Sequence, residues 1–141
     1  MPTDEVIAEW KGKLNSLKVL PFEAAGTIVR YEMTWFGEIS GRLSGHEIGT
    51  DYIAISPDGS GISDYFGVLT TSQGEIVLVE GHGTTIPTEQ GLVRARFGIK
   101  FRTAAPRLAW LTTIGAAFES EGDWSGDLST KTFLGRYVEW R

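Results

Sequence analysis

The chain has 141 residues, of which 41% are hydrophobic and 22% charged, and its formal net charge at pH 7 is −5. This length and composition are typical of one globular domain with a sizeable core, so we expect residues 1–141 to form a single domain. The absence of cysteine excludes disulfides, thiolate metal sites and cysteine nucleophiles. The negative charge argues against a nucleic-acid partner, because proteins that bind nucleic acids usually carry a dominant basic field.

The start of the chain predicts neither a leader nor a membrane segment. Charged residues are spread over positions 1–15, and no apolar run in the sequence approaches the roughly 20 residues needed to cross a bilayer. We therefore expect a cytoplasmic location and no membrane partner, which the lack of cysteine also fits.

The segment Asp4–Leu17 predicts a short amphipathic helix, which Thr3 or Asp4 could cap. Five apolar residues fall on one helical stripe: Val6, Ile7, Trp10, Leu14 and Leu17. The stripe favours a helix that closes one end of a barrel, and a partner-binding arm is the alternative. We assign residues 1–20 to this helical segment.

From residue 26 onward the chain alternates strand and turn signals. Between Val93 and Phe101 apolar side chains alternate with charged or small ones without interruption, which predicts a strand with one buried and one wet face. Turn signals such as Pro57-Asp58-Gly59 and Gln73-Gly74 separate similar segments. The predicted strands are Thr27–Phe36, Glu38–Ser44, Asp51–Ser56, Ile62–Thr71, Glu75–His82, Leu92–Arg102, Leu108–Phe118 and Lys131–Trp140.

No helix-length segment separates these strands, so the sequence predicts an all-β fold. We expect a small antiparallel β-barrel of about eight strands over residues 26–141, preceded by the short N-terminal helix. A barrel of this size either fills its interior with side chains or holds one small ligand there.

Two aspartates are candidate catalytic residues. By strand alternation Asp51 shares a face with Ile53 and Ile55, and Asp64 shares a face with Ile62 and Phe66. If these apolar faces line the interior, desolvation raises the carboxyl pKa values and suits the groups to general acid or base catalysis. The alternative is structural, because an aspartate beside glycine or at a strand end usually caps a turn.

Glu80 and His82 share a strand face and could form an acid–base pair at a barrel mouth, where they would contact substrate. The alternative is a solvated strand end. His46 lies in a glycine-rich region and is interpreted as a surface residue. With only two histidines and no close ligand spacing, we expect no metal site.

Aromatic residues give the main support for ligand binding. Those expected to line a pocket for an apolar or aromatic small molecule are Tyr31, Trp35, Phe97, Trp110 and Tyr137. The same rings could instead fill the barrel completely. Separately, Arg94, Arg96, Lys100 and Arg102 form a basic stripe, interpreted as the solvent-facing side of one strand or, alternatively, a surface for an anionic partner.

The last two-thirds of the chain contain a series of short motifs: Gly49, Asp51 and Tyr52, then Asp64, Leu69, Thr71 and Gly74, and finally Phe101, Thr103, Pro106, Leu108, Trp110 and Leu111. Together these motifs resemble the domain-of-unknown-function family 3237. The chain departs from the family pattern at Phe66 and Gly67, where the family usually has arginine and tyrosine, and at Leu108, where it usually has tyrosine.

The resemblance implies a barrel similar to that of the allene oxide cyclases, with spirotetronate cyclases and dirigent proteins as related barrels. Such barrels bind apolar, oxygenated substrates and steer ring closure or coupling, usually without a cofactor. Fold alone does not fix function. The leading hypothesis is thus a cofactor-independent isomerase or cyclase. A non-catalytic carrier or sensor, and a filled barrel that acts through its surface as a homo-oligomer, are the alternatives.

Overall fold

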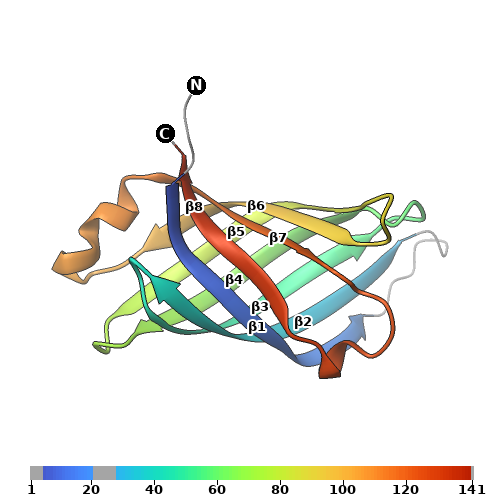
Figure 1. Ribbon diagram of the computed structural model, residues 1–141, viewed down its shortest axis with the longest axis horizontal. Coiled ribbons are helices and arrows are strands. Elements are labelled where there is room, and N and C mark those ends of the chain that lie inside the picture. Colours follow the sequence, from blue (N-terminus) through green and yellow to red (C-terminus); the bar gives the residue numbers. More distant parts are fainter. Residues whose placement is uncertain (1–4, 21–27, 141) are drawn as a thin grey trace.

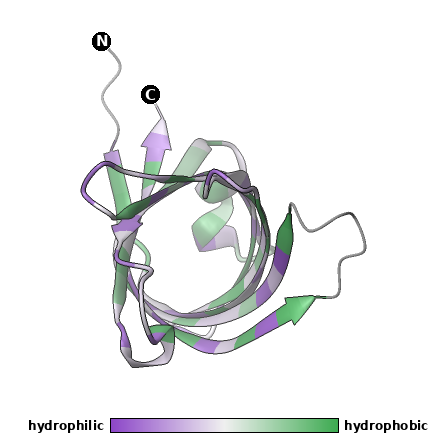
Figure 2. Ribbon diagram, turned by 90° about the vertical axis from the view of Figure 1, so that its right-hand side faces the viewer, coloured by the Kyte–Doolittle hydropathy of each residue, from purple (hydrophilic) through white to green (hydrophobic). Residues whose placement is uncertain are grey.

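The computed structural model describes residues 5–20 and 28–140, and these residues form one closed antiparallel barrel. Each strand pairs with the next along the chain, and β8 closes the ring onto β1 (Figures 1 and 2). The eight strands are β1 (Glu5–Leu20), β2 (Val29–Gly41), β3 (Gly45–Ile55), β4 (Gly61–Thr71), β5 (Ile76–Pro87), β6 (Val93–Arg102), β7 (Gly115–Gly122) and β8 (Phe133–Trp140). The prediction of an all-β barrel of eight antiparallel strands is confirmed.

The predicted N-terminal helix is wrong, because residues 5–20 form strand β1. This strand pairs with β2 along its length from Ala8 and with β8 up to Gly12, so it supplies the seam that closes the barrel. The pairing register shifts between Val6 and Ala8 and again between Leu14 and Ser16. Each shift inserts one extra residue into the two-residue alternation of the strand. The apolar residues then recur at intervals of three or four, which is the spacing expected of a helix.

Strand β2 joins two segments that the sequence predicted as separate strands, 27–36 and 38–44. The predicted strands are separated at Gly37, but this glycine lies inside strand β2. The Trp10 ring occupies the space where a Cβ of residue 37 would lie, so glycine is needed there. Strand β3 likewise begins at Gly45 rather than at Asp51. The predicted number of strands was therefore reached by counting β2 twice and omitting β1.

The predicted strand Leu108–Phe118 is also wrong in its first half. A 3-10 helix, η1 (Pro106–Thr112), precedes β7, and proline is well tolerated at such a helix start. Leu108 and Leu111 of η1 are fully buried and close one end of the barrel. The element that closes an end is thus η1 and not the N-terminal segment.

The two barrel ends differ in their connections. The η1 end also carries the β2–β3 and β4–β5 turns, on the left in Figure 1. The opposite, η2 end carries the β3–β4 and β5–β6 turns and the β7–β8 connection, which contains the short 3-10 helix η2 (Leu128–Thr130). The predicted turns at Gly59 and Gly74 are present, with both glycines at positive φ. Among the described residues, no helix is long and apolar enough to cross a membrane.

Candidate functional site

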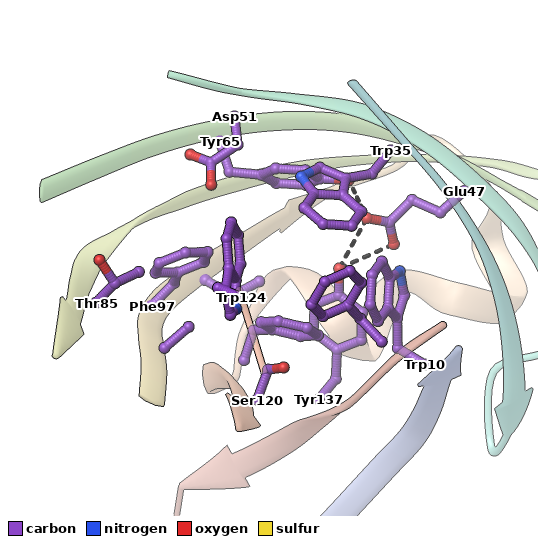
Figure 3. Close-up of a pocket in the computed structure, with 14 residues that line it drawn as sticks. Trp10, Trp35, Glu47, Asp51, Tyr65, Thr85, Phe97, Ser120, Trp124 and Tyr137 are labelled. Carbon is purple, nitrogen blue, oxygen red and sulfur yellow. Dashed lines mark hydrogen bonds between the residues drawn. The ribbon is translucent and has the colours of Figure 1, made fainter. Parts of the chain in front are cut away.

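A small cavity of about 50 Å³ lies inside the barrel and is lined mainly by aromatic rings. Trp35 packs edge-to-face with Phe133 and with Trp124, and the ring centroids are 5.2 Å and 5.8 Å apart, respectively. Phe118 packs on Phe97 at 6.0 Å. These distances are those of well-packed aromatic pairs, so the walls are closely packed and apolar (Figure 3).

One carboxyl group, that of Glu47, is completely enclosed in this apolar interior at 1% exposure. The Tyr137 hydroxyl donates to Glu47 Oε1 at 2.8 Å, and the Tyr65 hydroxyl donates to Oε2 (Figure 3). Burial raises the pKa of Glu47, and the two tyrosine hydrogen bonds oppose that rise only in part. The group therefore favours its neutral form, because taking a charge out of water without a cation is costly.

The backbone beneath Tyr65 explains how its hydroxyl reaches Glu47. Gly49 and Gly67 are register partners on β3 and β4, and a Cβ at either position would overlap the Tyr65 hydroxyl end. The ring therefore lies flat along the barrel wall over two glycines. Glycine in a strand interior often marks such a close approach.

A second carboxyl group, that of Asp51, also faces the cavity and is only 5% exposed. Burial raises its pKa from 3.8 to about 7, the Asp64 charge adds to the rise, and the nearby Ser63 hydroxyl opposes it. Neither Asp51 Oδ1 nor Ser63 Oγ makes a hydrogen bond of normal geometry within the described part of the chain. Asp51 is thus a buried carboxyl with an unsatisfied oxygen beside the small interior cavity.

Asp51 and Glu47 lie four residues apart on the same face of β3, a separation of about 13 Å along an extended strand. Asp51 lies on the side of Thr85, toward the η2 end, and Glu47 lies on the side of Trp10 (Figure 3). The cavity thus offers two protonatable groups at different depths. Such an arrangement can accept a proton at one position and donate a proton at another.

The prediction that Asp64 faces the interior is wrong. Asp64 lies on the outer face of β4, and its Oδ1 forms a hydrogen bond with His82 Nδ1 at 2.6 Å, with both side chains more than half exposed. The apolar residues that share its face, Ile62 and Phe66, are also exposed. The apolar face of this strand is therefore its outer face, and the inner face carries Ser63, Tyr65 and Leu69.

Glu80 and His82 are likewise outside the barrel, so their predicted place at a substrate-contacting mouth is wrong. His82 is held by Asp64, and Glu80 lies 3.9 Å from Arg102. The interpretation of the basic stripe as a solvent-facing surface is confirmed, since all four side chains are exposed. Arg94, for example, pairs with Glu121 at 3.2 Å.

The predicted aromatic residues divide into two groups. Trp35, Phe97 and Tyr137 line the cavity as expected. Tyr31 is half-buried on the inner face of β2 without reaching the cavity. Trp110 does not line it either, because it lies on η1, where the Arg42 guanidinium stacks 4.2 Å above its ring.

Sequence reasoning missed Glu47 as a site residue. Tyr65 was a possible hydroxyl donor to a ligand, but its strand parity is opposite to that of Asp64, so the expectation of an inward Asp64 kept it out of the site. Glu47 lies in the gap between the predicted strands Glu38–Ser44 and Asp51–Ser56, although it has the same strand parity as Gly49 and Asp51. Extending that alternation toward Gly45 would have placed Glu47 inside. In the described ranges 5–20 and 28–140, no three histidine, aspartate or glutamate side chains gather closely enough to hold a metal ion.

No family model matches the chain, and no curated protein matches it. The resemblance to family 3237 therefore stays a prediction. Solved structures do match over nearly the whole chain, at low sequence identity, and they show a shared fold.

A β-barrel-like protein from Acinetobacter baumannii has a TM-score of 0.83 at 16% identity, over 100% of this chain and 97% of that one. A protein of unknown function from Clostridium acetobutylicum has a TM-score of 0.83 at 13% identity, with 100% of both chains covered. An enzyme from Penicillium herquei has a TM-score of 0.66 at 17% identity, over 99% and 95%. The barrel is thus an architecture found in uncharacterised proteins and in at least one enzyme.

Proposed function

We propose that this barrel is a cofactor-independent isomerase or cyclase that acts on an apolar, oxygenated small molecule. The observation that carries the proposal is Asp51, a buried carboxyl with an unpaired oxygen that faces an aromatic cavity. A packed core gains nothing from such a group, because an unsatisfied buried carboxyl destabilises the fold. Groups of this kind cluster at functional sites.

The role proposed for Asp51 is that of general base. Its pKa of about 7 lies where a base is both sufficiently ionised and sufficiently strong at neutral pH. Asp51 removes a proton from a carbon or hydroxyl of the substrate, and the electron pair moves into a neighbouring carbonyl or into the new ring bond.

Glu47 and its two tyrosines are proposed to supply the proton that replaces the one removed by Asp51. When Glu47 is neutral it has one hydrogen of its own to donate, so one tyrosine hydroxyl no longer has to donate to it. That hydroxyl can then donate to the substrate oxygen on which charge develops. A proton enters the substrate there or at carbon, so isomerisation or ring closure leaves the mass unchanged.

The size of the cavity defines what must move. A volume of about 50 Å³ accepts a few atoms, whereas small-molecule sites usually measure about 300–1,000 Å³. Trp124 lines the cavity from the β7–β8 connection rather than from a strand, and it is only half-buried. Substrate entry at the η2 end is therefore proposed to displace the Trp124 ring.

The same small volume favours a second candidate function, a filled barrel that acts through its outer surface. The two candidates differ in whether the interior opens to a ligand. A non-catalytic carrier would open in the same way and would release its ligand unchanged.

A thermal-shift screen with polyketides, terpenoids, fatty-acid epoxides and phenolics separates these possibilities. A ligand at about 100 times its dissociation constant adds about 2.7 kcal/mol, a rise of roughly 5–10 °C for a chain of this length. Ligands that stabilise the protein are then incubated with it and analysed by chromatography and mass spectrometry for a product of equal mass.

The Asp51→Asn and Asp64→Asn variants form a matched pair, since both remove one aspartate charge. We expect Asp51→Asn to retain the thermal shift and to lower turnover at least about 100-fold, the usual contribution of a general base. Asp64→Asn should lower turnover far less, because burial is the largest cause of the raised Asp51 pKa and the Asp64 charge only adds to it. Equal turnover in both variants would remove Asp51 from the mechanism, and no shift with any compound would favour the filled barrel.

A further inference from the structure

The outer surface of the barrel carries an apolar face on β3, β4 and β5, independent of the interior cavity. Its centre consists of Ile48, Tyr52, Ile62, Phe66, Val68 and Leu78, all between 44% and 68% exposed. Phe36 of β2 and Ile76 of β5 extend it at its edges and are similarly exposed. We refer to these eight residues as the β3–β5 face.

The pairing register makes this face continuous. Phe36 pairs with Ile48, Ile48 with Val68, and Val68 with Leu78, which produces one apolar row across four strands. Phe66 and Tyr52 lie in the next two rows on the same side of the sheet. Side chains directly opposite on adjacent strands are only about 4.5–5.5 Å apart at Cβ, so the row leaves no polar gap.

The wall beyond β5 is charged. Outward positions on β6 hold Arg94, Arg96, Lys100 and Arg102, and those on β7 hold Glu119 and Glu121. Exposed apolar residues such as Leu134 also occur on other strands, but eight are concentrated on β2–β5, where they include a paired row across four strands. Such concentration marks an interaction surface, whereas scattered apolar residues do not.

The area of the face matches what a stable dimer needs. Aromatic side chains have about 150–250 Å² of surface and aliphatic ones somewhat less, so three aromatic and five aliphatic residues that are about half exposed present on the order of 800 Å². The largest apolar patch on a typical monomer covers about 300–600 Å². A standard protein–protein interface buries about 800 Å² on each partner.

The charges of the face indicate which partner fits. Asp64 and His82, which lie within it, pair with each other at 2.6 Å, and Glu80 at its edge lies 3.9 Å from Arg102. A charged partner or an anionic lipid surface would find no unpaired charge of opposite sign there. A twofold contact brings the same face onto itself, and a face that is mainly apolar, with its polar side chains paired to each other, is self-complementary.

We infer that two copies of this chain associate through their β3–β5 faces in a twofold-symmetric dimer. The contact lies on the side wall of each barrel, so both η2 ends stay accessible. The inference does not depend on the proposed catalytic function, because the interior carboxyl groups take no part in it.

Analytical ultracentrifugation of the full chain between about 0.1 and 100 µM tests the inference. We expect the wild type to sediment as a dimer in the micromolar range. The double variant Ile48→Lys, Val68→Lys introduces two positive charges per copy at the centre of the contact. The twofold axis brings the charges of both copies together, so the dimer interface would hold four. It should weaken dimerisation at least about 100-fold, because a buried unpaired charge is strongly unfavourable.

Leu134→Lys is the matched control, since Leu134 is an exposed apolar residue on the outer face of β8. This variant should remain dimeric, and circular dichroism with thermal melting should show all three proteins folded. A wild type that is monomeric at 100 µM overturns the inference, as does an oligomer that survives in the double variant. Monomeric wild type that co-sediments with phosphatidylcholine vesicles, and loses this in the double variant, would assign the face to lipid and also overturn it.

Discussion

Asp51 and Asp64 lie one pairing step apart on neighbouring strands, yet they occupy opposite environments. Asp51 pairs in register with Tyr65, and Tyr52 pairs with Asp64, so adjacent rows of the same two strands carry the two carboxyl groups. Asp51 is buried with an unsatisfied oxygen, whereas Asp64 is exposed and holds His82. A single step of strand parity therefore separates a candidate base from a surface ion pair.

Glu47 provides a third carboxyl group to compare with Asp51 and Asp64. It is buried like Asp51 but is satisfied by two tyrosine hydroxyls. Comparing the three carboxyl groups separates the effect of burial from the effect of hydrogen bonding. The following predictions test that separation, beginning with the largest expected effect.

The largest effect is a pH dependence that comes from Asp51. Its folded pKa of about 7 is raised above the ordinary 3.8, so between these values the folded state binds more protons than the unfolded state. Stability therefore falls as pH rises through this window, by about 4 kcal/mol in total. Urea unfolding at pH 4, 6 and 8 should show this loss in the wild type relative to Asp51→Asn.

The difference between these two proteins isolates Asp51, because Glu47 contributes to both in the same direction. Asp64→Asn serves as the control and should retain most of the wild-type slope, because burial is the largest cause of the raised Asp51 pKa and the Asp64 charge only adds to it. Parallel curves for wild type and Asp51→Asn would mean that Asp51 titrates normally and is hydrated.

The intermediate effect concerns the hydrogen bonds to Glu47. Tyr137→Phe removes a donor at 2.8 Å from a fully buried carboxyl and should cost about 1–3 kcal/mol in the free energy of unfolding. Tyr31→Phe removes a hydroxyl from a half-buried tyrosine outside the network and should cost less than about 0.5 kcal/mol. Denaturant unfolding measures both, and equal costs would contradict a satisfied Glu47.

The smallest effect belongs to the exposed ion pair. Asp64→Asn should change the free energy of unfolding by no more than about 1 kcal/mol, since solvent screens the pair with His82. Repeating the measurement in 1 M NaCl should reduce even this difference. A loss above about 2 kcal/mol that persists in salt would show that Asp64 is not the surface residue described above.

Several features of the fold were accessible from the sequence because they depend on local alternation. The buried residues of β6, Ala95 to Phe101, follow the predicted alternation, and so do Met33 and Trp35 on β2. On these strands one face is clearly more apolar than the other, so period-two alternation identifies the inner face.

Strand β4 shows why the same reasoning failed elsewhere. Its outer face carries Ile62, Phe66 and Val68, which belong to the β3–β5 face, and its inner face carries Ser63 and Gly67. The outer face is the more apolar of the two, so a prediction based on hydrophobicity placed Asp64 on the inner face and Tyr65 on the outer face. An apolar outer surface removes the contrast on which such predictions rest.

The sequence by itself determined that this chain forms alternating strands and tight turns, because both depend on neighbouring residues. Only the tertiary structure decided that residues 5–20 close the ring as a strand, and which face of β3, β4 and β5 lines the interior. Closure supplies hydrogen-bond partners to both edges of β1, and pairing register brings Tyr65 over two glycines onto Glu47. These are long-range contacts between distant segments, and no local pattern encodes them.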